Sequence, residues 1–504
     1  MADKIDSNIT GLRFAEEASL KTLPVTPVWY PLEPNSYSDF GGQLATIARN
    51  PINPSRQRKK GVITDLDASG GFNQDLTFNN TTRLLQGFFF ADMREKFTTQ
   101  TLNSAAVAMT AILASADDYT AAAGLGGVIS GDLILAEGFG VTANNGLKIA
   151  NGSSTATALS VSDALTDEAS PPATAKLTLV GHQFASADCN IVMNGTLAQL
   201  TSAAVTMTTL PLIEGEWVYL GDDTTANHFT NNQGYARIKR IAAGFIEFDK
   251  TTWTPQAETG TGKTIRIYYG SVLKNEDDPT DIIRRTYNVE RTLGNDANGV
   301  MSEYLVGAVS NELTVNVAQA DKVTIDLSFV ACDNEQRNGT TGVKTGDRPA
   351  LTSEDAYNTS SDFARIKLAL VSDDTDINPL FAYATQLTLT VNNNVTPNKA
   401  IGVLGAFDTS AGTFEVGGNI TAYFASIDAV QSVRNNADIT LDIILAKDNK
   451  ALIIDVPLIS LGDGRLGVEQ DQAITLPLET NAAESPFGHT LLFQSFPYLP
   501  NSAI

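Results

Sequence analysis

One segment of the sequence carries residues that could bind a nucleotide phosphate. It reads Ala257-Glu258-Thr259-Gly260-Thr261-Gly262-Lys263-Thr264, close to the phosphate loop of nucleotide-binding proteins. Such a loop joins a buried strand to a helix, because the amides at the helix N-terminus cradle the phosphate. Here the following residues, 265–269, have the composition of a strand, and Ala257 stands where the motif has Gly. We therefore interpret the segment as a hairpin loop and predict no cofactor.

Residues that could bind a metal or act as a nucleophile are few and widely spaced. The three histidines are His182, His228 and His489. Cys189 lies near His182, but no second pair completes a zinc site. The acidic segments 373–376 and 463–464 lack the ligand order of an EF-hand calcium loop. With no nucleophile-elbow pattern either, we predict no metal site, no catalytic residue and no enzymatic activity.

The composition excludes several classes of protein. A chain of 504 residues with 42% hydrophobic residues has the length for two to four globular domains. Its 34 basic and 57 acidic residues give a net charge of −23, which argues against adhesive binding of nucleic acid. Two cysteines, Cys189 and Cys332, cannot form a disulfide framework. Residues 1–7 lack the features of a signal peptide, and no apolar run reaches the ~18 residues of a membrane span.

A glycine-rich motif occurs twice in the chain, at Gly61–Phe72 and at Gly402–Phe414. Gly, Val, Asp and Ser match in register, and Leu66 and Phe407 share apolar character. We interpret the Asp-x-Ser sequence of each copy as a turn between two strands. Each copy precedes a β-prone run and a candidate helix, so the repeat predicts a pair of related domains.

These repeats, together with Tyr287–Arg291 and Gly307–Val315, resemble the tail tube proteins of long-tailed bacteriophages in their large, duplicated form. The resemblance covers most of the chain outside about residues 100–275. It implies a structural subunit of a non-contractile, siphovirus-type tail, whose rings stack into a hollow conduit for DNA passage into the host. The implied partners are the protein itself and the tape-measure, tail terminator and tail tip proteins. DNA would be a non-adhesive cargo, with no membrane involved and with assembly of the virion tail in the host cytoplasm.

The expected fold is mainly β. It contains two tandem tail-tube-like β-sandwich or barrel domains, each with a short helix, and inserted small β modules. The expected divisions are an N-terminal arm (1–45), a discontinuous first domain (46–100 and 275–345), an inserted appendage (101–274) and a second domain (346–504).

Three local expectations follow from the sequence pattern. Residues 13–20 are a candidate short helix, and the prolines after them predict an extended arm, lying either on a neighbouring subunit or on its own domain. The alternation in Ile439-Thr440-Leu441-Asp442-Ile443 predicts a strand with one buried face and one face in water.

The inserted segment has an internal repeat of its own, at Gly131–Ile149 and Gly215–Ile238, each read as strand, loop, Asn-containing turn and strand. Because insertions at exposed hairpins are tolerated, we expect an outward appendage that can be deleted without loss of tube formation. The segment also motivates an alternative function, a β-rich virion surface or decoration protein that binds host glycans. Trp217, Tyr219 and Tyr235 could then form an aromatic platform, or could belong to the core.

The densest basic run surrounds a predicted hairpin tip and comprises Arg56, Arg58, Lys59 and Lys60. It is either a solvated loop or a contact with an acidic face of another subunit, and the resemblance favours a contact with the next ring. The resemblance also implies trimeric rings with pseudo-sixfold symmetry, because two domains per chain fill two of six positions. Asp65 is the best candidate for an acidic residue that faces the lumen.

Overall fold

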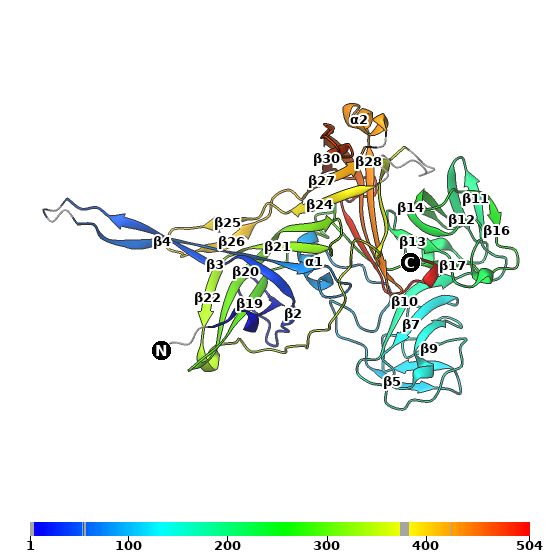
Figure 1. Cartoon of the computed structure of the whole chain (residues 1–504). Helices are drawn as coiled ribbons and strands as arrows, with labels where there is room; N and C mark the ends of the chain where they lie inside the picture. Colours follow the sequence, from blue (N-terminus) through cyan, green and yellow to red (C-terminus); the bar gives the residue numbers. More distant parts are fainter. Residues whose placement is uncertain (1–4, 53, 55–56, 373–382, 425, 504) are drawn as a thin grey trace.

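The computed structural model describes residues 5–52, 54, 57–372, 383–424 and 426–503. Over these residues the protein is mainly β, with antiparallel strands and two α-helices, α1 (Thr82–Phe89) and α2 (Ile427–Arg434). A long hairpin projects from one end of the elongated molecule, and a separate β-rich body lies at the other end (Figure 1). The prediction of a mainly β fold with short helices is confirmed.

The first structural unit surrounds helix α1. Its strands are β1 (Gly11–Glu16), β3 (Pro34–Arg49), β4 (Lys59–Asp75), β19 (Tyr287–Asp296), β20 (Gly299–Ala318), β21 (Thr324–Ala331) and β22 (Asp333–Arg337). A short strand, β2 (Tyr30–Leu32), pairs with β1 at the edge. The unit is discontinuous, because 197 residues of sequence separate α1 from β19.

The second unit surrounds helix α2. Its strands are β23 (Phe363–Leu370), β24 (Ala384–Asn392), β25 (Thr396–Lys399), β26 (Ala406–Ser410), β27 (Glu415–Tyr423), β28 (Ile439–Lys447), β29 (Lys450–Asp463), β30 (Thr475–Ala482) and β31 (Leu492–Phe496). Strands β24 and β25 run out along one side of a hairpin, and β26 and β27 return along the other.

The two units have the same order of strand pairing. In the first unit the pairs are β1·β19, β19·β20, β20·β21, β20·β22, β21·β4 and β4·β3. In the second unit they are β23·β28, β28·β29, β29·β30, β29·β31, β30·β27 and β27·β24. Each unit also has its helix between the outgoing hairpin and the next strand.

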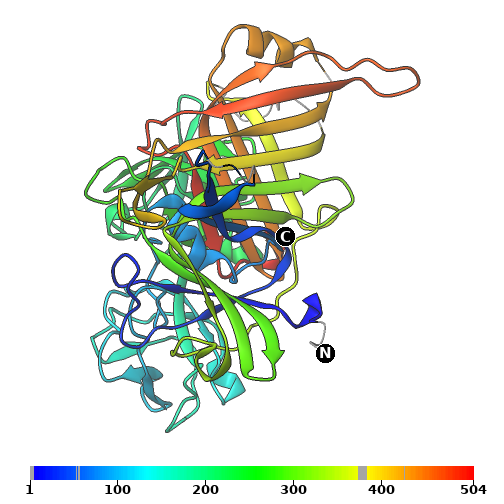
Figure 2. The ribbon, with the colours of Figure 1, turned by 90° about the vertical axis from the view of Figure 1, so that its left-hand side faces the viewer.

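One sheet runs through both units. Strand β20 of the first unit pairs with β24 of the second in an unbroken antiparallel ladder, from Glu312 opposite Asn392 to Ala318 opposite Gln386. Figure 2 shows these strands side by side, in green and yellow. The two units are therefore joined by backbone hydrogen bonds as well as by packed side chains.

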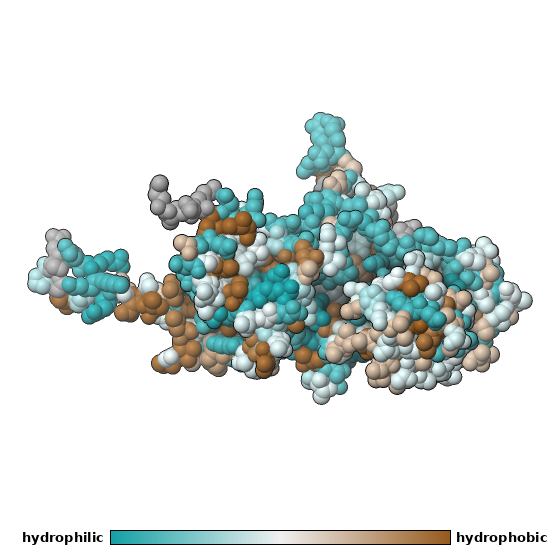
Figure 3. All heavy atoms as spheres, turned by 90° about the horizontal axis from the view of Figure 1, so that it is seen from below, coloured by the Kyte–Doolittle hydropathy of each residue, from teal (hydrophilic) through white to brown (hydrophobic). Residues whose placement is uncertain are grey.

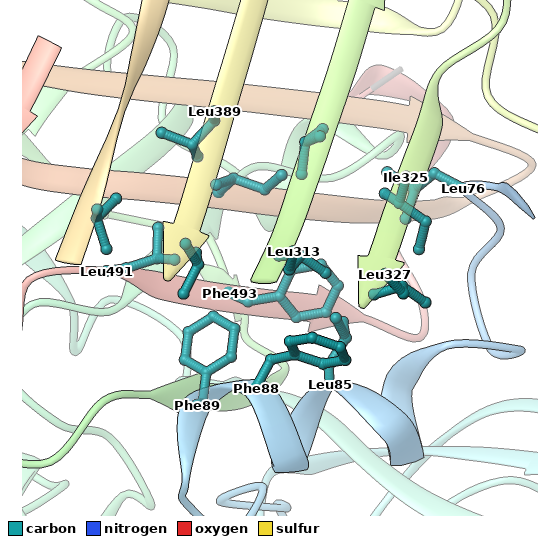
Figure 4. Packing of buried hydrophobic residues seen from close by; sticks show 14 of the residues in the cluster. Leu76, Leu85, Phe88, Phe89, Leu313, Ile325, Leu327, Leu389, Leu491 and Phe493 are labelled. Carbon is teal, nitrogen blue, oxygen red and sulfur yellow. The ribbon is translucent and has the colours of Figure 1, made fainter. Parts of the chain in front are cut away.

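The main core lies on one face of this sheet. Alternate residues of β20 and β24 are buried, including Leu313, Val315 and Leu389, as expected for strands with one covered face. Helix α1 covers them with Leu85, Phe88 and Phe89 (Figure 4). The ring of Phe88 packs edge-on against Phe329, with 5.4 Å between the centroids.

Residues 101–270 form the separate body. A three-stranded sheet comprises β5 (Met109–Leu113), β6 (Asp118–Ala121) and β9 (Ala158–Ser160). A ten-stranded sheet comprises β7 (Asp132–Glu137), β8 (Gly146–Ile149), β10 (Lys176–Gln183), β11 (Asn190–Asn194), β12 (Leu197–Thr201), β13 (Trp217–Leu220), β14 (Gly234–Ala242), β15 (Phe245–Thr251), β16 (Glu258–Thr259) and β17 (Arg266–Tyr268). The predicted repeat corresponds to the pairs β7·β8 and β13·β14. After it, β18 (Ser271–Lys274) returns to the main sheet beside β31.

Two local predictions are wrong. The predicted helix over residues 13–20 does not form, because residues 13–16 belong to strand β1, which pairs with β19 and buries Phe14 and Ala15. The predicted Asp-x-Ser turn at Asp67 lies inside the continuous strand β4, where residues 68–75 are held by the ladder to β21. At this position Gly70 and Gly71 permit close packing against Phe40 and the Leu327 carbonyl.

A third prediction, that one face of residues 439–443 meets water, is also wrong. Thr440 and Asp442 are each 1% exposed, because the separate body packs against the face that the pattern marks as polar. The Arg237 guanidinium of that body donates to the Thr440 hydroxyl at 2.9 Å.

Candidate functional site

The face of the main sheet opposite α1 is polar and carries no basic residue. The strand segments that form it are 68–75, 309–318, 324–331, 384–392, 415–423 and 475–482, and none of them contains Lys or Arg. Five acidic residues lie on this face: Asp75, Glu312, Asp326, Glu415 and Glu479. The rest of the face is mainly Asn, Thr, Ser and Gly, and we call it the polar face.

The register places the side chains of the polar face in rows across the strands. One row runs from Asn73 through Asp326 and Thr314 to Thr390. Both oxygens of the Asp326 carboxylate accept hydrogen bonds from amides, that of Asn73 at 2.8 Å and that of Asn316 at 2.6 Å. These neutral donors fix the carboxylate without cancelling its charge.

The acidic residues of the middle of the face have no cation beside them. Among the residues that the structure describes, no Lys or Arg lies within ion-pair distance of Glu312, Asp326, Glu415 or Glu479. Asp75, at the end of β4, is the exception, with Lys322 Nζ 2.7 Å away. The polar face therefore presents an uncompensated negative charge over the length of the sheet.

The long hairpin of β3 and β4, which we call the first hairpin, projects beyond this face. Apolar side chains gather along its middle (Figure 3). The exposed ones are Leu44, Ile47, Val62 and Ile63. A β-hairpin with exposed apolar side chains on an open edge is unfavourable in water, which marks this segment as a contact surface.

The predicted basic contact residues lie near the tip of the first hairpin. Arg58, Lys59 and Lys60 are exposed, whereas Arg56 lies outside the described residues. Lys59 begins β4, fourteen residues before Asn73 on the polar face, a separation of about 45 Å along an extended strand. The cationic tip and the acidic face are thus at opposite ends of the same strand.

Asp65, the predicted lumen-facing residue, lies on the same side of β4 as Asn73 but is not a free charge. Lys399 Nζ, from the second hairpin (β24–β27), lies 2.5 Å from Asp65 Oδ2 and also contacts Asp67. The hydrogen bond from Lys399 holds the pKa of Asp65 below its usual value. This ionic clamp joins the two hairpins, and Asp65 contributes less negative potential than Asp326 does.

The resemblance to a phosphate loop has no structural basis. Residues 260–265 connect β16 to β17, so the loop leads into a strand, as the sequence predicts, and no helix follows to bind phosphate. Lys263 Nζ instead donates to the Thr230 hydroxyl at 2.8 Å. Among the described residues no group of three or more His, Cys, Asp or Glu side chains has the arrangement of a metal site.

The inserted body binds the second unit through a buried seam that sequence reasoning missed. Its apolar part comprises Leu133, Val180, Trp217, Tyr219, Tyr235 and Tyr268 of the body with Ile444, Ile453, Phe496 and Leu499 of the second unit. Trp217, Tyr219 and Tyr235 are at most 5% exposed, so they cannot form the glycan platform of the alternative function. They belong to the core, the other possibility that the sequence left open.

An ionic cluster lies in the same seam. The Arg237 guanidinium, 1% exposed, is 2.7 Å from Asp249 of its own body and 3.2 Å from Asp455 of strand β29. Burial raises the pKa of Asp455 to about 7, although Arg237 opposes the rise. Gln494 pairs with both backbone groups of Trp217, its amide nitrogen donating and its oxygen accepting at 2.8 Å.

No α-helix among the described residues has the length and apolarity to cross a membrane. A family model described as phage tail tube protein matches residues 7–211 and 218–482, nearly the whole chain. The comparison with curated proteins finds no match.

Proposed function

Because the chain belongs to the phage tail tube protein family, we propose that its polar face lines the channel of a tube built from rings of three chains. The protein is a structural component of the virion tail tube and not an enzyme, and proteins of this family assemble into rings. The proposal concerns how this chain builds the ring and what the channel wall presents to DNA.

The observation that carries the proposal is the internal β20·β24 junction. In the first unit, the C-terminal half of β20 has β21 on one side and β24 on the other. The corresponding half of β29 in the second unit has β30 on one side, and residues 460–463 pair with no other described strand. At the opposite end of the sheet, β3 pairs only with β4 among the described strands.

The sheet of one chain thus has two complementary open edges, one along β3 and one along residues 460–463 of β29. A second copy that repeats the internal junction would place its β3 beside β29 and would remove both edges, which otherwise favour aggregation. Such a contact is head-to-tail and closes into a ring when the rotation allows it. With two equivalent units per chain, three chains supply six positions, so the ring has threefold symmetry and pseudo-sixfold appearance.

The same strand correspondence supports an origin of the two units by duplication. Six strand pairs, the position of the helix and the repeated Gly-Val…Asp-x-Ser motif agree between them. The first domain is then discontinuous (46–100 and 275–345), with β1 and most of β3 contributed from residues 1–45. The appendage occupies 101–274, and the second domain occupies 346–504.

In this arrangement the polar face is the channel wall. Duplex DNA carries one negative charge per about 1.7 Å of axis, and a wall with basic side chains would bind it and slow its passage. A wall of fixed amides and uncompensated carboxylates repels the duplex weakly and lets it slide. DNA is therefore a non-adhesive cargo, and the first hairpin, with Arg58, Lys59 and Lys60 near its tip, points to the next ring.

The opposite side of the sheet faces outward and carries α1 and the inserted body. A tube covered by such bodies leaves little room for a contractile sheath, which supports a long, non-contractile tail of the siphovirus type. Tape-measure, terminator and tip proteins are the partners expected inside the tube and at its ends. Images of the intact particle test this point, since a sheath around the tube would contradict it.

Charge reversal on the polar face tests the channel proposal. The double variant Asp326→Lys/Glu479→Lys should still form tubes, while particles that carry it should release DNA more slowly at low salt than at high salt. Asp281→Lys is the control, because Asp281 is exposed in a turn beside Ile283, whose amide donates to the Phe90 carbonyl at the end of α1. Equal rates of DNA release by wild type, double variant and control would contradict the proposal.

A further inference from the structure

The two hairpins carry one apolar position whose burial differs between the units. Leu66 in β4 and Phe407 in β26 occupy the same place in the repeated motif, one residue before Asp67 and Asp408. Leu66 is 8% exposed, whereas Phe407 is 50% exposed. An aromatic side chain half in water at a position that is otherwise buried indicates a missing contact.

Part of the cover of Leu66 comes from the second hairpin of the same chain. The turn of that hairpin folds over the end of the first unit, where the Ala406 amide donates to the Cys332 carbonyl at 3.1 Å. Gly405 lies close to Leu66 there, since a Cβ atom added at Gly405 would be 3.5 Å from Leu66 Cδ2. The Lys399 clamp to Asp65 and Asp67 holds the hairpin in this position.

The correspondence between the units identifies what would cover Phe407. By the repeated motif, Gly405 of the second hairpin corresponds to Thr64 of the first. Within one chain Phe407 lies beside two further exposed apolar side chains, Val403 and Leu404. On the first hairpin, Val62 and Ile63 match Val403 and Leu404 in the motif, and both are exposed. Leu44, on the neighbouring strand of that hairpin, is exposed as well.

We propose that the first hairpin of a second copy of this chain lies over Phe407, so that the joint between chains is apolar where the joint within the chain is ionic. This inference rests on the proposed ring and specifies its contact surface. Ala45 occupies the place that Lys399 has in the second hairpin, with Leu44 beside it, and Ala406 occupies the place of Asp65. Asp408, the counterpart of Asp67, already pairs with Arg284 at 3.1 Å.

The difference has a function in assembly. The ionic clamp sets the second hairpin in place while the chain is still a monomer. The apolar joint forms only when a neighbouring chain arrives, and burial of apolar surface then drives association without a requirement for low salt.

Cross-linking between two single-cysteine variants tests the inference directly. Thr64→Cys and Phe407→Cys are mixed, assembled into tubes and treated with a short thiol-specific cross-linker. The native Cys189 and Cys332 are buried. A cross-linked dimer is expected in the mixture and in neither variant alone, and a mixture of Phe407→Cys with Val192→Cys, exposed on the inserted body, is the control.

The outcomes separate this inference from the ring itself. Tubes that form without a cross-link above the control level would overturn the Phe407 joint and leave the ring intact. Failure of the wild-type chain to form rings under all assembly conditions would overturn the ring proposal.

Substitution gives a second, independent readout. Phe407→Ser should raise the concentration needed for assembly by about tenfold or more, because a central aromatic side chain dominates interface energetics. Lys399→Ala, which loosens the hairpin within the chain but removes no residue of the apolar joint, should raise that concentration much less. An equal effect of the two substitutions would contradict the assignment of an apolar joint between chains.

Discussion

The two units of the main sheet share their strand order but differ in what covers their outer side. In the first unit Tyr304 and Val306 are covered by Ala15 and Trp29, from the N-terminal part of the same unit. In the second unit the corresponding strands are covered by the inserted body, which interrupts the sequence of the first unit. The first unit is thus covered by its own residues, whereas the second unit is covered by a segment inserted into the sequence of the first.

This difference bears on whether the inserted segment is needed for folding. A segment placed in an exposed loop is expected to be a dispensable appendage, and its internal repeat supports that expectation. The seam with Ile444, Ile453 and Phe496 argues against that expectation, because these side chains would be exposed to water if the body were removed. We therefore propose that the insertion and the second unit form one folding unit, and that the body contributes to stability as well as to the outer surface of the proposed tube.

The largest effect is therefore expected from deletion of residues 101–269 with a short Gly/Ser link. The deletion exposes the apolar side of the seam and leaves Asp455 buried without its cation, so we expect insoluble or partly unfolded protein. Expression followed by circular dichroism measures this. Deletion of residues 51–57, which connect β3 to β4 in the sequence, is the control and should leave the monomer soluble. A soluble, cooperatively folding product from the larger deletion would show that the second unit does not need the insertion.

A smaller loss is expected from Arg237→Leu. Removing one partner of a buried ion pair costs about 3–5 kcal/mol, since the remaining charge has no counter-ion. Urea unfolding of the full chain should show this loss, whereas Lys399→Ala, at the exposed clamp, should cost no more than about 1 kcal/mol. Similar losses for the two substitutions would remove the distinction between a buried seam and an exposed clamp.

The pH dependence of stability sharpens the same contrast. The pKa of Asp455 is raised to about 7 by burial, so the folded state holds its proton more tightly than the unfolded state does. This residue thus contributes stability that is fully present below the unfolded pKa of about 4 and is lost as pH rises through about 7. The midpoint temperature of thermal unfolding should therefore decrease less steeply between pH 5 and pH 8 for Asp455→Asn than for wild type. Parallel curves for the two proteins would contradict the assignment.

The smallest effect is expected from Lys263→Ala in the segment that imitates a phosphate loop. Its hydrogen bond to Thr230 is exposed, so the unfolding free energy should change by less than about 0.5 kcal/mol. Isothermal titration with ATP should show no binding to wild type or variant. ATP binding by wild type that disappears in the variant would require a different account of this loop.

What the sequence could predict followed from local patterns. Alternation and glycine-rich turns were sufficient for the strands and for the mainly β fold, and the repeated motif located both hairpins. The same reasoning failed where a distant segment changed the environment. Thr440 and Asp442 have the spacing of a face in water, yet Arg237, about 200 residues earlier, lies against that face. No periodicity within β28 contains that information.

In the candidate site, too, local patterns were informative and contacts with distant segments could not be predicted. Asp65 was the best single candidate for an acidic residue that faces the lumen, but it is paired with Lys399, which lies 334 residues later in the chain. The unpaired acids, such as Asp326 and Glu479, could be identified only from the register of β4, β21, β20 and the strands beyond. Sequence reasoning indicated the sign of the charge, and the strand pairing identifies the acids that lie on the polar face.

Electron cryo-microscopy of the assembled tube tests the central claim most directly. The account predicts three chains per ring, β3 of one chain hydrogen-bonded beside β29 of the next, and Asp326, Glu312 and Glu479 on the channel wall. It also predicts that Arg58, Lys59 and Lys60 point along the tube axis to the adjacent ring. Six chains per ring, or a channel lined by these basic residues with the acids outside, would contradict it.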